Sequence, residues 1–498
     1  MVVILNGMLQ VRLSGRQVHS SVFWACLILA CLLLFPSLHA QKVTVSDEIN
    51  IKSNFAYDVF PDVKENILFY HDRANEHWLE VYDDELKFKH SRQIQFPARP
   101  HDIVTMVKAD TVVNVYYVWK EHQKHTISYL TIDHEGNPVD TAVHIFFQEG
   151  MFFPSIRYAL SEDRSKLVLF WVEGRFFNYM ILTNEKNSRV TDSGKIECKE
   201  FNFKSDFTGL ALTNEGIIYI VGQKERAWNK NSDQSVMILT VKNAIYELRF
   251  LGVSDWAISQ IRFRYDHVNH NLCLGGLLST GDEESTVGYF VHRFSSEGDQ
   301  LMTEMTSHLF TLEFIAEVYG KKTTKIKKIS DAYLEDIFIR QDGGILLILE
   351  IKKEFLRRAG SGAMSRFGDV YSGRGFIDYY NEDLIVLSTE PDGREDWKKV
   401  LYKKQFSQDD NAIFSSYFLF LTPSRMKLIY NDEIKTNSTV SEYILDPLGN
   451  LERKSVLSTQ YQNLKLRFQE AIQISSHSLI VPSENINKIN IVKIDYQE

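Results

Sequence analysis

Short apolar runs separated by turn residues recur along the chain from residue 55 onward. Many of them alternate apolar and polar positions, as the two faces of a strand require, and few are long enough for a helix. One short helix is predicted at residues 310–319. Many short strands at regular spacing predict an all-β fold, which can be a sandwich, a barrel or a propeller.

Two elements repeat within this pattern. The first is a strand, a short turn and a strongly apolar strand, which occurs at residues 156–171, 210–220, 337–349 and 418–430. The second is a hairpin with a glycine in its turn, which occurs at residues 128–137, 290–299, 386–393 and 443–450. Glycine suits a tight hairpin because it adopts positive φ without steric cost. Joined, the two elements make a four-stranded antiparallel unit, which is the size of a propeller blade.

The repeat predicts a ring of eight blades. Seven units lie near residues 55–97, 100–148, 153–203, 206–253, 257–309, 333–407 and 411–459. The remainder supplies three strands, at residues 464–473, 478–482 and 489–494, and the isolated segment 43–52 supplies a fourth. Closure by a strand from the other terminus removes sheet edges that invite aggregation. Seven blades is the alternative count, because the first two boundaries are weakest, and a pair of β-sandwiches is the alternative fold.

The first 40 residues predict a signal peptide. Two arginines precede an unbroken apolar run at residues 22–35, which ends at Pro36 and is followed by Ala40 as a small cleavage residue. The run is shorter than the roughly 20 residues of a transmembrane helix. We therefore expect a secreted or periplasmic protein with no transmembrane segment in the mature chain, which forms one domain from residue 41 to 498. A lipid anchor on Cys31 is less favoured, because apolar residues continue after it.

Composition narrows the possible partners and cofactors. The chain has 498 residues, of which 44% are hydrophobic and 12% aromatic, and its net charge is −9. This acidic surface repels phosphate backbones, so we expect no nucleic-acid partner. Cys198 and Cys273 remain after the leader, and we expect two buried thiols in non-adjacent blades rather than a disulfide. No cysteine and histidine cluster indicates a metal site, and we expect no cofactor.

A lysine-rich segment is the first departure from the repeat. It lies between the predicted fifth and sixth blades and contains Lys321, Lys322, Lys325, Lys327 and Lys328. Such a run is either a solvated linker that resists edge pairing or a docking patch for an acidic partner or anionic glycan.

A long insertion at residues 351–382 is the second departure. It joins the second and third strands of the sixth blade, and its glycines favour mobility. Its arginines and tyrosines are residue types favoured in binding surfaces. It is either a surface excursion without a partner or a ligand-binding loop. For the second alternative the candidate residues are Arg357, Arg358, Arg366, Tyr371, Arg374, Tyr379 and Tyr380.

Several short motifs follow one another around this insertion. They are Asp342-Gly343-Gly344 with the apolar strand to Glu350, Tyr379-Tyr380-Asn381-Glu382-Asp383, Asp392-Gly393-Arg394, Lys403-Lys404-Gln405, Ser415-Ser416-Tyr417 and Tyr430-Asn431-Asp432. Over roughly residues 331–450 this ordered series resembles a family of uncharacterised secreted bacterial proteins with a propeller-like repeat. The resemblance implies export and a β-rich repeat fold, and it implies no catalytic residue.

No catalytic motif stands out. The sequence lacks a GxSxG elbow, an HExxH helix, a P-loop and an EF-hand loop. It therefore favours a non-catalytic binding or scaffold propeller of the bacterial cell envelope or exterior, with a protein or glycan partner. One alternative is a carbohydrate-active or other hydrolytic propeller with acidic residues in the central channel, although no pair of acids is singled out. Another is a purely structural spacer in a larger complex.

Overall fold

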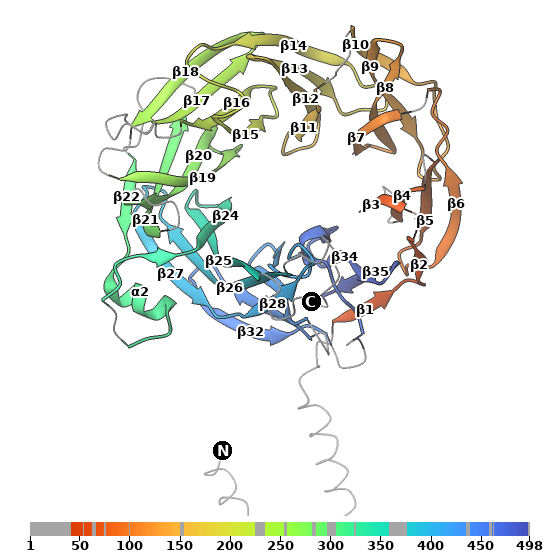
Figure 1. Ribbon diagram of the computed structural model, residues 1–498. Helices are drawn as coiled ribbons and strands as arrows, with labels where there is room; N and C mark the ends of the chain where they lie inside the picture. Colours follow the sequence, from red (N-terminus) through yellow and green to blue (C-terminus); the bar gives the residue numbers. More distant parts are fainter. Residues whose placement is uncertain are drawn as a thin grey trace, which may run out of the picture.

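The fold is an eight-bladed β-propeller. The computed structural model describes residues 41–52, 54–61, 66–73, 76–98, 100–149, 154–224, 235–252, 256–280, 285–295, 305–322, 325–357, 376–434, 439–457, 461 and 463–496. Within these residues eight antiparallel sheets, each built on a four-stranded meander, stand side by side in a ring (Figure 1). The predicted propeller and its eight blades are confirmed, and the alternatives of seven blades or two sandwiches are wrong.

The first four blades follow one another along the chain. The first contains β3 (Asn54–Pro61), β4 (Ile67–Arg73), β5 (Glu76–Tyr82) and β6 (Phe88–Gln93). The second contains β7 (Pro100–Ala109), β8 (Val112–Glu121), β9 (Lys124–Ile132) and β10 (Val143–Glu149). The third contains β11 (Arg157–Leu160), β12 (Lys166–Glu173), β13 (Phe176–Thr183) and β14 (Val190–Glu197). The fourth contains β15 (Phe207–Leu212), β16 (Ile218–Gln223), β17 (Ser235–Lys242) and β18 (Ile245–Gly252).

Of the next three blades, the fifth and the sixth each carry one additional short strand. The fifth contains β19 (Ala257–Asp266), β20 (Asn271–Ser279), β21 (Ser285–Ser295) and β22 (Thr306–Leu309), with β23 (Ile329–Ser330) added to β21. The sixth contains β24 (Ala332–Ile339), β25 (Ile345–Arg357), β26 (Phe376–Thr389) and β27 (Glu395–Leu401), with β28 (Gln405–Gln408) added to β26. The seventh contains β29 (Phe418–Leu421), β30 (Met426–Glu433), β31 (Thr439–Leu445) and β32 (Leu451–Ser455).

Both ends of the chain build the eighth blade. It contains β33 (Ile472–Gln473), β34 (Ser478–Asn485) and β35 (Lys488–Asp495), and β1 (Lys42–Val45) and β2 (Ile49–Asn50) pair with β35. Closure by the N-terminal segment is therefore confirmed. The predicted strand 464–473 is largely wrong, because most of this segment is irregular and includes the short helix η2 (Phe468–Glu470). The irregular path lets Arg467 contact Tyr57, Glu470 and Glu484.

Turn chemistry explains why the strands begin and end where they do. Gly136, Gly393 and Gly449 have φ of 79°, 88° and 77° in turns between the third and fourth strands of their blades, as predicted. The fourth predicted glycine turn falls at residues 296–300, outside the described residues. Asp446 fixes the last of these turns, because its carboxylate accepts hydrogen bonds from the backbone N–H of Leu448 and of Asn450, at 3.0 and 2.9 Å. Aspartate favours turns for this reason.

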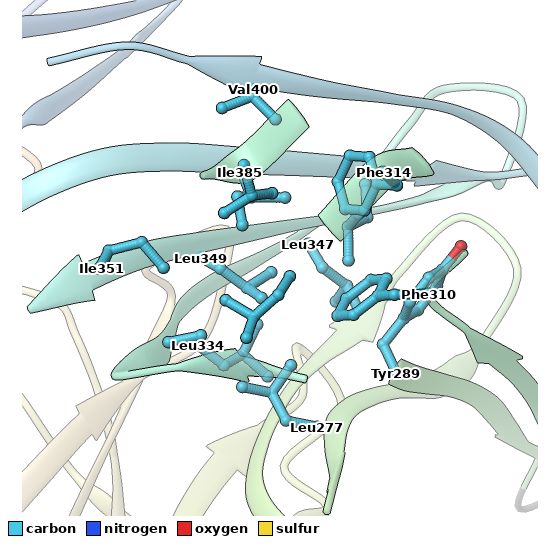
Figure 2. Close-up of a cluster of buried hydrophobic side chains, with 14 of the residues drawn as sticks. Leu277, Tyr289, Phe310, Phe314, Leu334, Leu347, Leu349, Ile351, Ile385 and Val400 are labelled. Atoms are coloured by element: carbon cyan, nitrogen blue, oxygen red, sulfur yellow. The ribbon is translucent and has the colours of Figure 1, made fainter. Parts of the chain in front are cut away.

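The hydrophobic core is divided among the spaces between neighbouring sheets. The cluster between the fifth and sixth blades joins Leu277 and Tyr289 of one sheet to Leu347 of the next (Figure 2). Helix α2 (Leu312–Val318) covers this cluster from outside and buries Phe314 in it. The helix begins after Thr311, whose hydroxyl accepts a hydrogen bond from Phe314 N–H at 3.3 Å. It confirms the helix predicted at residues 310–319, with narrower bounds.

Cys198 and Cys273 are free and buried, as predicted. Among the described residues, no helix combines the length and the apolar character needed to span a bilayer.

The meander gives the ring two different ends. Successive strands run in opposite directions. The turns between first and second strands, and between third and fourth strands, therefore lie at one end, which we call the turn end. The second-to-third connections and the links between blades lie at the other.

Candidate functional site

The sixth blade extends away from the turn end as a three-stranded arm. β24 pairs with β25 only as far as Ile351, but β25 and β26 continue together from Lys352↔Asn381 to Arg357↔Phe376. β28 then pairs with the other side of β26, from Asn381↔Gln405 to Asp378↔Gln408. We call residues 352–357, 376–381 and 405–408 the arm. With 13 and 14 residues, β25 and β26 are the longest strands among the described residues.

One face of the arm presents aromatic rings. Phe355, Tyr380 and Phe406, which we call the aromatic row, contact one another across the three strands, with ring centroids 5.7 and 4.9 Å apart. Phe355 is 53% exposed, and Leu356 beside it is 68% exposed. Leu356 points to the opposite face of β25 from Phe355, so each face of the arm carries one exposed apolar side chain near its end.

The other face of the arm packs against the link to the seventh blade. Tyr379 is buried there, and its hydroxyl lies 3.3 Å from Asn411 Oδ1. Gln405 and Ser407 are also buried. Because neighbouring residues of a strand point to opposite faces, Tyr379 and Tyr380 belong to different surfaces. Of the two, only Tyr380 lies with the aromatic row.

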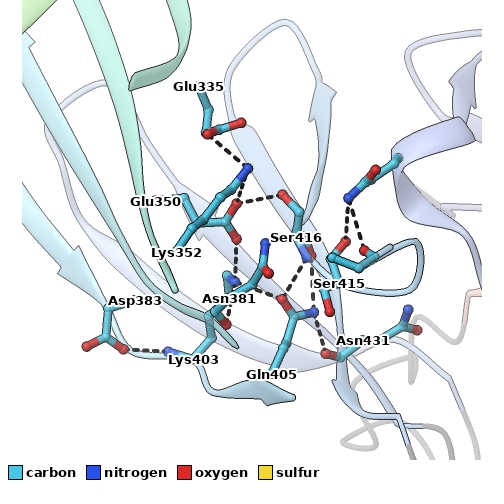
Figure 3. Close-up of polar contacts among 12 residues, drawn as sticks. Glu335, Glu350, Lys352, Asn381, Asp383, Lys403, Gln405, Ser415, Ser416 and Asn431 are labelled. Carbon is cyan, nitrogen blue, oxygen red and sulfur yellow. Dashed lines mark hydrogen bonds and ion pairs between the residues drawn. The ribbon is translucent and has the colours of Figure 1, made fainter. Parts of the chain in front are cut away.

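A buried ion pair lies at the base of the arm (Figure 3). The Nζ atom of Lys403 lies 2.6 Å from Oε1 of Glu350, and both side chains are 0% exposed. Ser416 donates a hydrogen bond to the other carboxylate oxygen at 2.8 Å. Lys352 contacts two carboxylates. Its Nζ atom lies 3.2 Å from the carboxylate of Glu350 and 2.9 Å from that of Glu335. Burial works against ionisation of Glu350, but Lys403 and Lys352 outweigh it and lower the pKa of this carboxyl.

The network continues into the seventh and eighth blades. Gln405 accepts a hydrogen bond from Lys403 Nζ at 2.8 Å and donates to Asn431 O at 2.8 Å. Asn431 in turn donates to Leu466 O in the eighth blade at 2.7 Å. Buried hydrogen bonds such as these specify one arrangement of the elements that they join. The arm is thus held on three blades.

The residues of this network come from the ordered motifs of the sequence. Glu350, Asn381, Lys403, Gln405, Ser416 and Asn431 all lie in those motifs and are all buried. Sequence reasoning did not foresee that they meet. A signal existed in Glu350, which is a lone acid directly after five apolar residues of one strand, and such an acid requires a buried partner.

The predicted insertion 351–382 is partly corrected by these findings. Residues 351–357 and 376–382 are strand rather than loop, because β28 supplies hydrogen-bond partners to β26. Arg357 ends β25 and pairs with Phe376. Arg358, Arg366, Tyr371 and Arg374 lie outside the described residues.

The lysine-rich segment lies on the outer side of the ring beside α2 (Figure 1). Lys321, Lys322, Lys325 and Lys327 are exposed, and none of them forms an ion pair with a described residue. Lys328 is half-buried, and its carbonyl oxygen accepts a hydrogen bond from Tyr319 at 3.3 Å. The segment leads to Asp331, whose carbonyl accepts from the N–H of Lys352 in the arm at 2.9 Å.

Acidic residues line a hollow where the first and eighth blades meet. The hollow has a volume of about 390 Å³, and Tyr57, Asp58 and Glu470 are among its lining residues. Tyr57 donates a hydrogen bond to Glu470 at 2.9 Å. Burial raises the pKa of Asp58, and burial also raises the pKa of Glu470 in spite of nearby Arg467. Among the described residues no cluster of three or more histidine, cysteine or acidic side chains can hold a metal ion.

No protein-family model and no curated protein sequence matches the chain. Similar solved structures include one described as the Dos1 propeller, with 9% identity, a TM-score of 0.43, and coverage of 90% of this chain and 94% of that chain. The uncharacterised protein lmo1340 from Listeria monocytogenes EGD-e has 9% identity, a TM-score of 0.37, and coverage of 78% and 92%. A protein from Lactobacillus plantarum has 13% identity, a TM-score of 0.36, and coverage of 84% and 96%. These identities are too low to carry a function to this chain.

Proposed function

We propose that this chain is an exported, non-catalytic binding or scaffold propeller of the bacterial cell envelope or exterior, and that it meets a protein or glycan partner through the arm of the sixth blade. The observation that carries the proposal is the aromatic row, in which Phe355 is exposed and Tyr380 and Phe406 are half-buried, on a base fixed by buried polar contacts. A blade needs four strands of ordinary length, so the arm adds surface that ring formation does not require.

The physical properties of the arm suit recognition. Aromatic rings supply large contact area with few rotatable bonds, so they lose little entropy when a partner binds. The buried network holds the strands beneath them in one arrangement, which lowers the cost of ordering further. Phe355 and Leu356 remain exposed in the folded chain and are available for contact.

The lysine-rich segment supports a second contact with the same partner. Lys321, Lys322, Lys325 and Lys327 form no ion pair with a described residue, on a chain whose net charge is −9. Oppositely charged surfaces steer partners together and fix their orientation. The segment therefore fits an acidic protein surface or an anionic glycan.

Export is supported by the sequence. The first 40 residues have the three parts of a signal peptide, and the motif series resembles secreted bacterial proteins. Both features agree with a partner in the cell envelope.

A capture experiment with one matched pair of variants tests the arm. The mature chain, Phe355→Ser and Phe250→Ser are immobilised and exposed to the same cell-envelope extract. Phe250 is the control, because it is also 53% exposed and lies on β18 of the fourth blade. We expect proteins or glycans that bind the wild type and Phe250→Ser and are lost from Phe355→Ser. Identical capture by all three chains would contradict the proposal.

A second candidate function is hydrolysis at the hollow between the first and eighth blades. Asp58 and Glu470 both line this hollow, and burial raises the pKa of each, which is the direction that a general acid of a two-carboxylate hydrolase requires. A screen with chromogenic glycosides and esters separates the two functions. Turnover that Glu470→Gln abolishes would favour hydrolysis over binding.

A further inference from the structure

A groove opens between the sixth and seventh blades at the turn end, opposite the arm. Three turns surround it, at residues 340–344, 422–425 and 446–450. Each turn is closed by a backbone hydrogen bond, such as Arg340 N–H to Gly344 O at 2.8 Å and Thr422 N–H to Arg425 O at 2.9 Å. The groove has a volume of about 420 Å³. This lies within the range of roughly 300–1,000 Å³ that is typical of small-molecule sites.

The groove is apolar because it opens onto the core between two blades. Phe338 and Leu346 of the sixth blade and Met426 and Leu445 of the seventh belong to one buried cluster, and all four line the groove. Trp397 packs against the same cluster and donates a hydrogen bond to Pro447 O at 3.2 Å. Aliphatic side chains, one phenyl ring and one indole ring therefore form the inner surface, which suits an aliphatic group.

Most charges at the rim are already paired. The Arg340 guanidinium contacts Asp342 and Asp396. Asp342 also accepts the Gly344 N–H at 2.9 Å. Asp446 accepts two backbone N–H groups of its own turn and the side chain of Asn450, at 2.8 Å. These carboxylates have hydrogen-bond partners within their own turns.

Arg425 differs from its neighbours at the rim. It is exposed, lines the groove, and forms no ion pair with a described residue. Its backbone closes the turn with Thr422, which fixes the position of the residue, and its guanidinium interacts with the Asp446 carboxylate only at long range, without an ion pair. A guanidinium binds carboxylates through two parallel hydrogen bonds. The rim is therefore suited to an anion.

We propose that the groove binds a small aliphatic carboxylate, with the hydrocarbon chain between the sixth and seventh blades and the carboxylate at Arg425. Burial of the chain supplies most of the affinity, and Arg425 selects the charge of the head group. This site is distant along the strands from the arm and does not depend on a partner there. The chain thereby acquires a small-ligand site in addition to its proposed contact surface.

Calorimetric titration of the full mature chain with octanoate, nonanoate and decanoate tests the hydrocarbon part. These acids are used below their critical micelle concentrations. Each added methylene is expected to raise affinity about fourfold until the groove is filled. Ser424→Trp places a large ring at the exposed rim and is expected to weaken all three ligands. The absence of binding, or binding that is insensitive to both chain length and Ser424→Trp, would overturn the proposal.

The head group is tested with three ten-carbon ligands that differ in the charge of the head group. Decanoate, decanol and decylamine are compared on the wild type, Arg425→Gln and Arg189→Gln. Arg189 is the matched control, because it is an exposed arginine without an ion pair among the described residues, in the third blade. Arg425→Gln is expected to weaken decanoate about tenfold or more and to leave decanol unchanged. Equal affinity of the wild type for decylamine and decanoate, or equal effects of the two arginine variants on decanoate affinity, would overturn the proposal.

Discussion

At the scale of single residues, the structure depends on a buried ion pair. Glu350 and Lys403 are both fully buried, and each alone would face a large desolvation cost. Ser416 and Gln405 complete their hydrogen bonds, which makes the burial tolerable. The pair lies where the arm leaves the blade, so it decides whether the arm has one orientation.

Removal of one partner should therefore be costly. We expect Glu350→Gln to lower the free energy of unfolding by about 3–5 kcal/mol, because it leaves the Lys403 charge buried and unpaired. Glu452→Gln is the control, since Glu452 pairs with Lys454 at the surface, with both side chains about half exposed. That variant is expected to change stability by less than about 1 kcal/mol. Denaturant unfolding measures both, and equal effects would show that the buried pair contributes no more than a surface pair.

The same pair predicts a pH dependence. The fold lowers the pKa of Glu350 below its value in the unfolded chain, about 4.3. Its contribution to stability is therefore fully present above that unfolded value and is lost as the pH falls through the lower folded value. The stability gap between wild type and Glu350→Gln should narrow as the pH is lowered from 5 to about 2. A gap that stays constant in thermal unfolding across this range would contradict the assigned shift.

At the scale of elements, the sixth blade shows what the sequence could and could not reveal. The turns and apolar strands of the blade follow from local patterns, and Gly343 and Gly393 have the positive φ that their turns require. The arm could not be predicted from these local patterns, because β26 is stabilised there by β28, a strand from the link to the next blade. Local patterns around the glycine-rich segment predict a loop. Only this tertiary pairing decides that Tyr379 is buried while Tyr380 belongs to the aromatic row.

A turn glycine provides a test at this scale. Gly449 has φ of 77°, and a Cβ atom there would lie 2.6 Å from Cδ2 of Trp397. Gly174 has φ of 60° with nothing within 4 Å of such an atom. Gly174→Ala should cost about 1–2 kcal/mol from backbone strain alone. Gly449→Ala should cost about 1–3 kcal/mol more because of the steric clash, and equal costs in denaturant unfolding would contradict that account.

At the scale of the whole molecule, the eighth blade joins the two ends of the chain. The sequence predicted this closure because the last unit lacked a strand and the first segment had no neighbour. It did not predict the irregular path of residues 464–471, because Arg467 there takes partners in both the first and the eighth blade. Contacts between blades at this junction follow from ring closure and leave no periodic signal in the sequence. For the same reason, local sequence patterns did not single out the carboxylates Asp58 and Glu470.

Closure of the ring has a measurable consequence. A mature chain without residues 41–46 loses β1, so residues 492–495 of β35 become an exposed sheet edge, while β2 still pairs with Lys488 and Ile489. We expect a lower thermal midpoint and concentration-dependent association, because an unpaired edge recruits other strands. Lys42→Gln, which removes only an exposed ion pair with Glu85, should leave both properties unchanged. Thermal unfolding and light scattering measure them, and an unchanged, monomeric chain without β1 would contradict the role of this strand.

The central claim is that the arm, rather than the hollow between the first and eighth blades, carries the function. The most direct measurement is the dissociation constant of a captured envelope partner for the wild type, Phe355→Ser and Glu470→Gln. We expect Phe355→Ser to weaken binding about thirtyfold or more, as for a buried interface aromatic, and Glu470→Gln to leave it unchanged. Retained affinity in Phe355→Ser together with a loss in Glu470→Gln would contradict the claim.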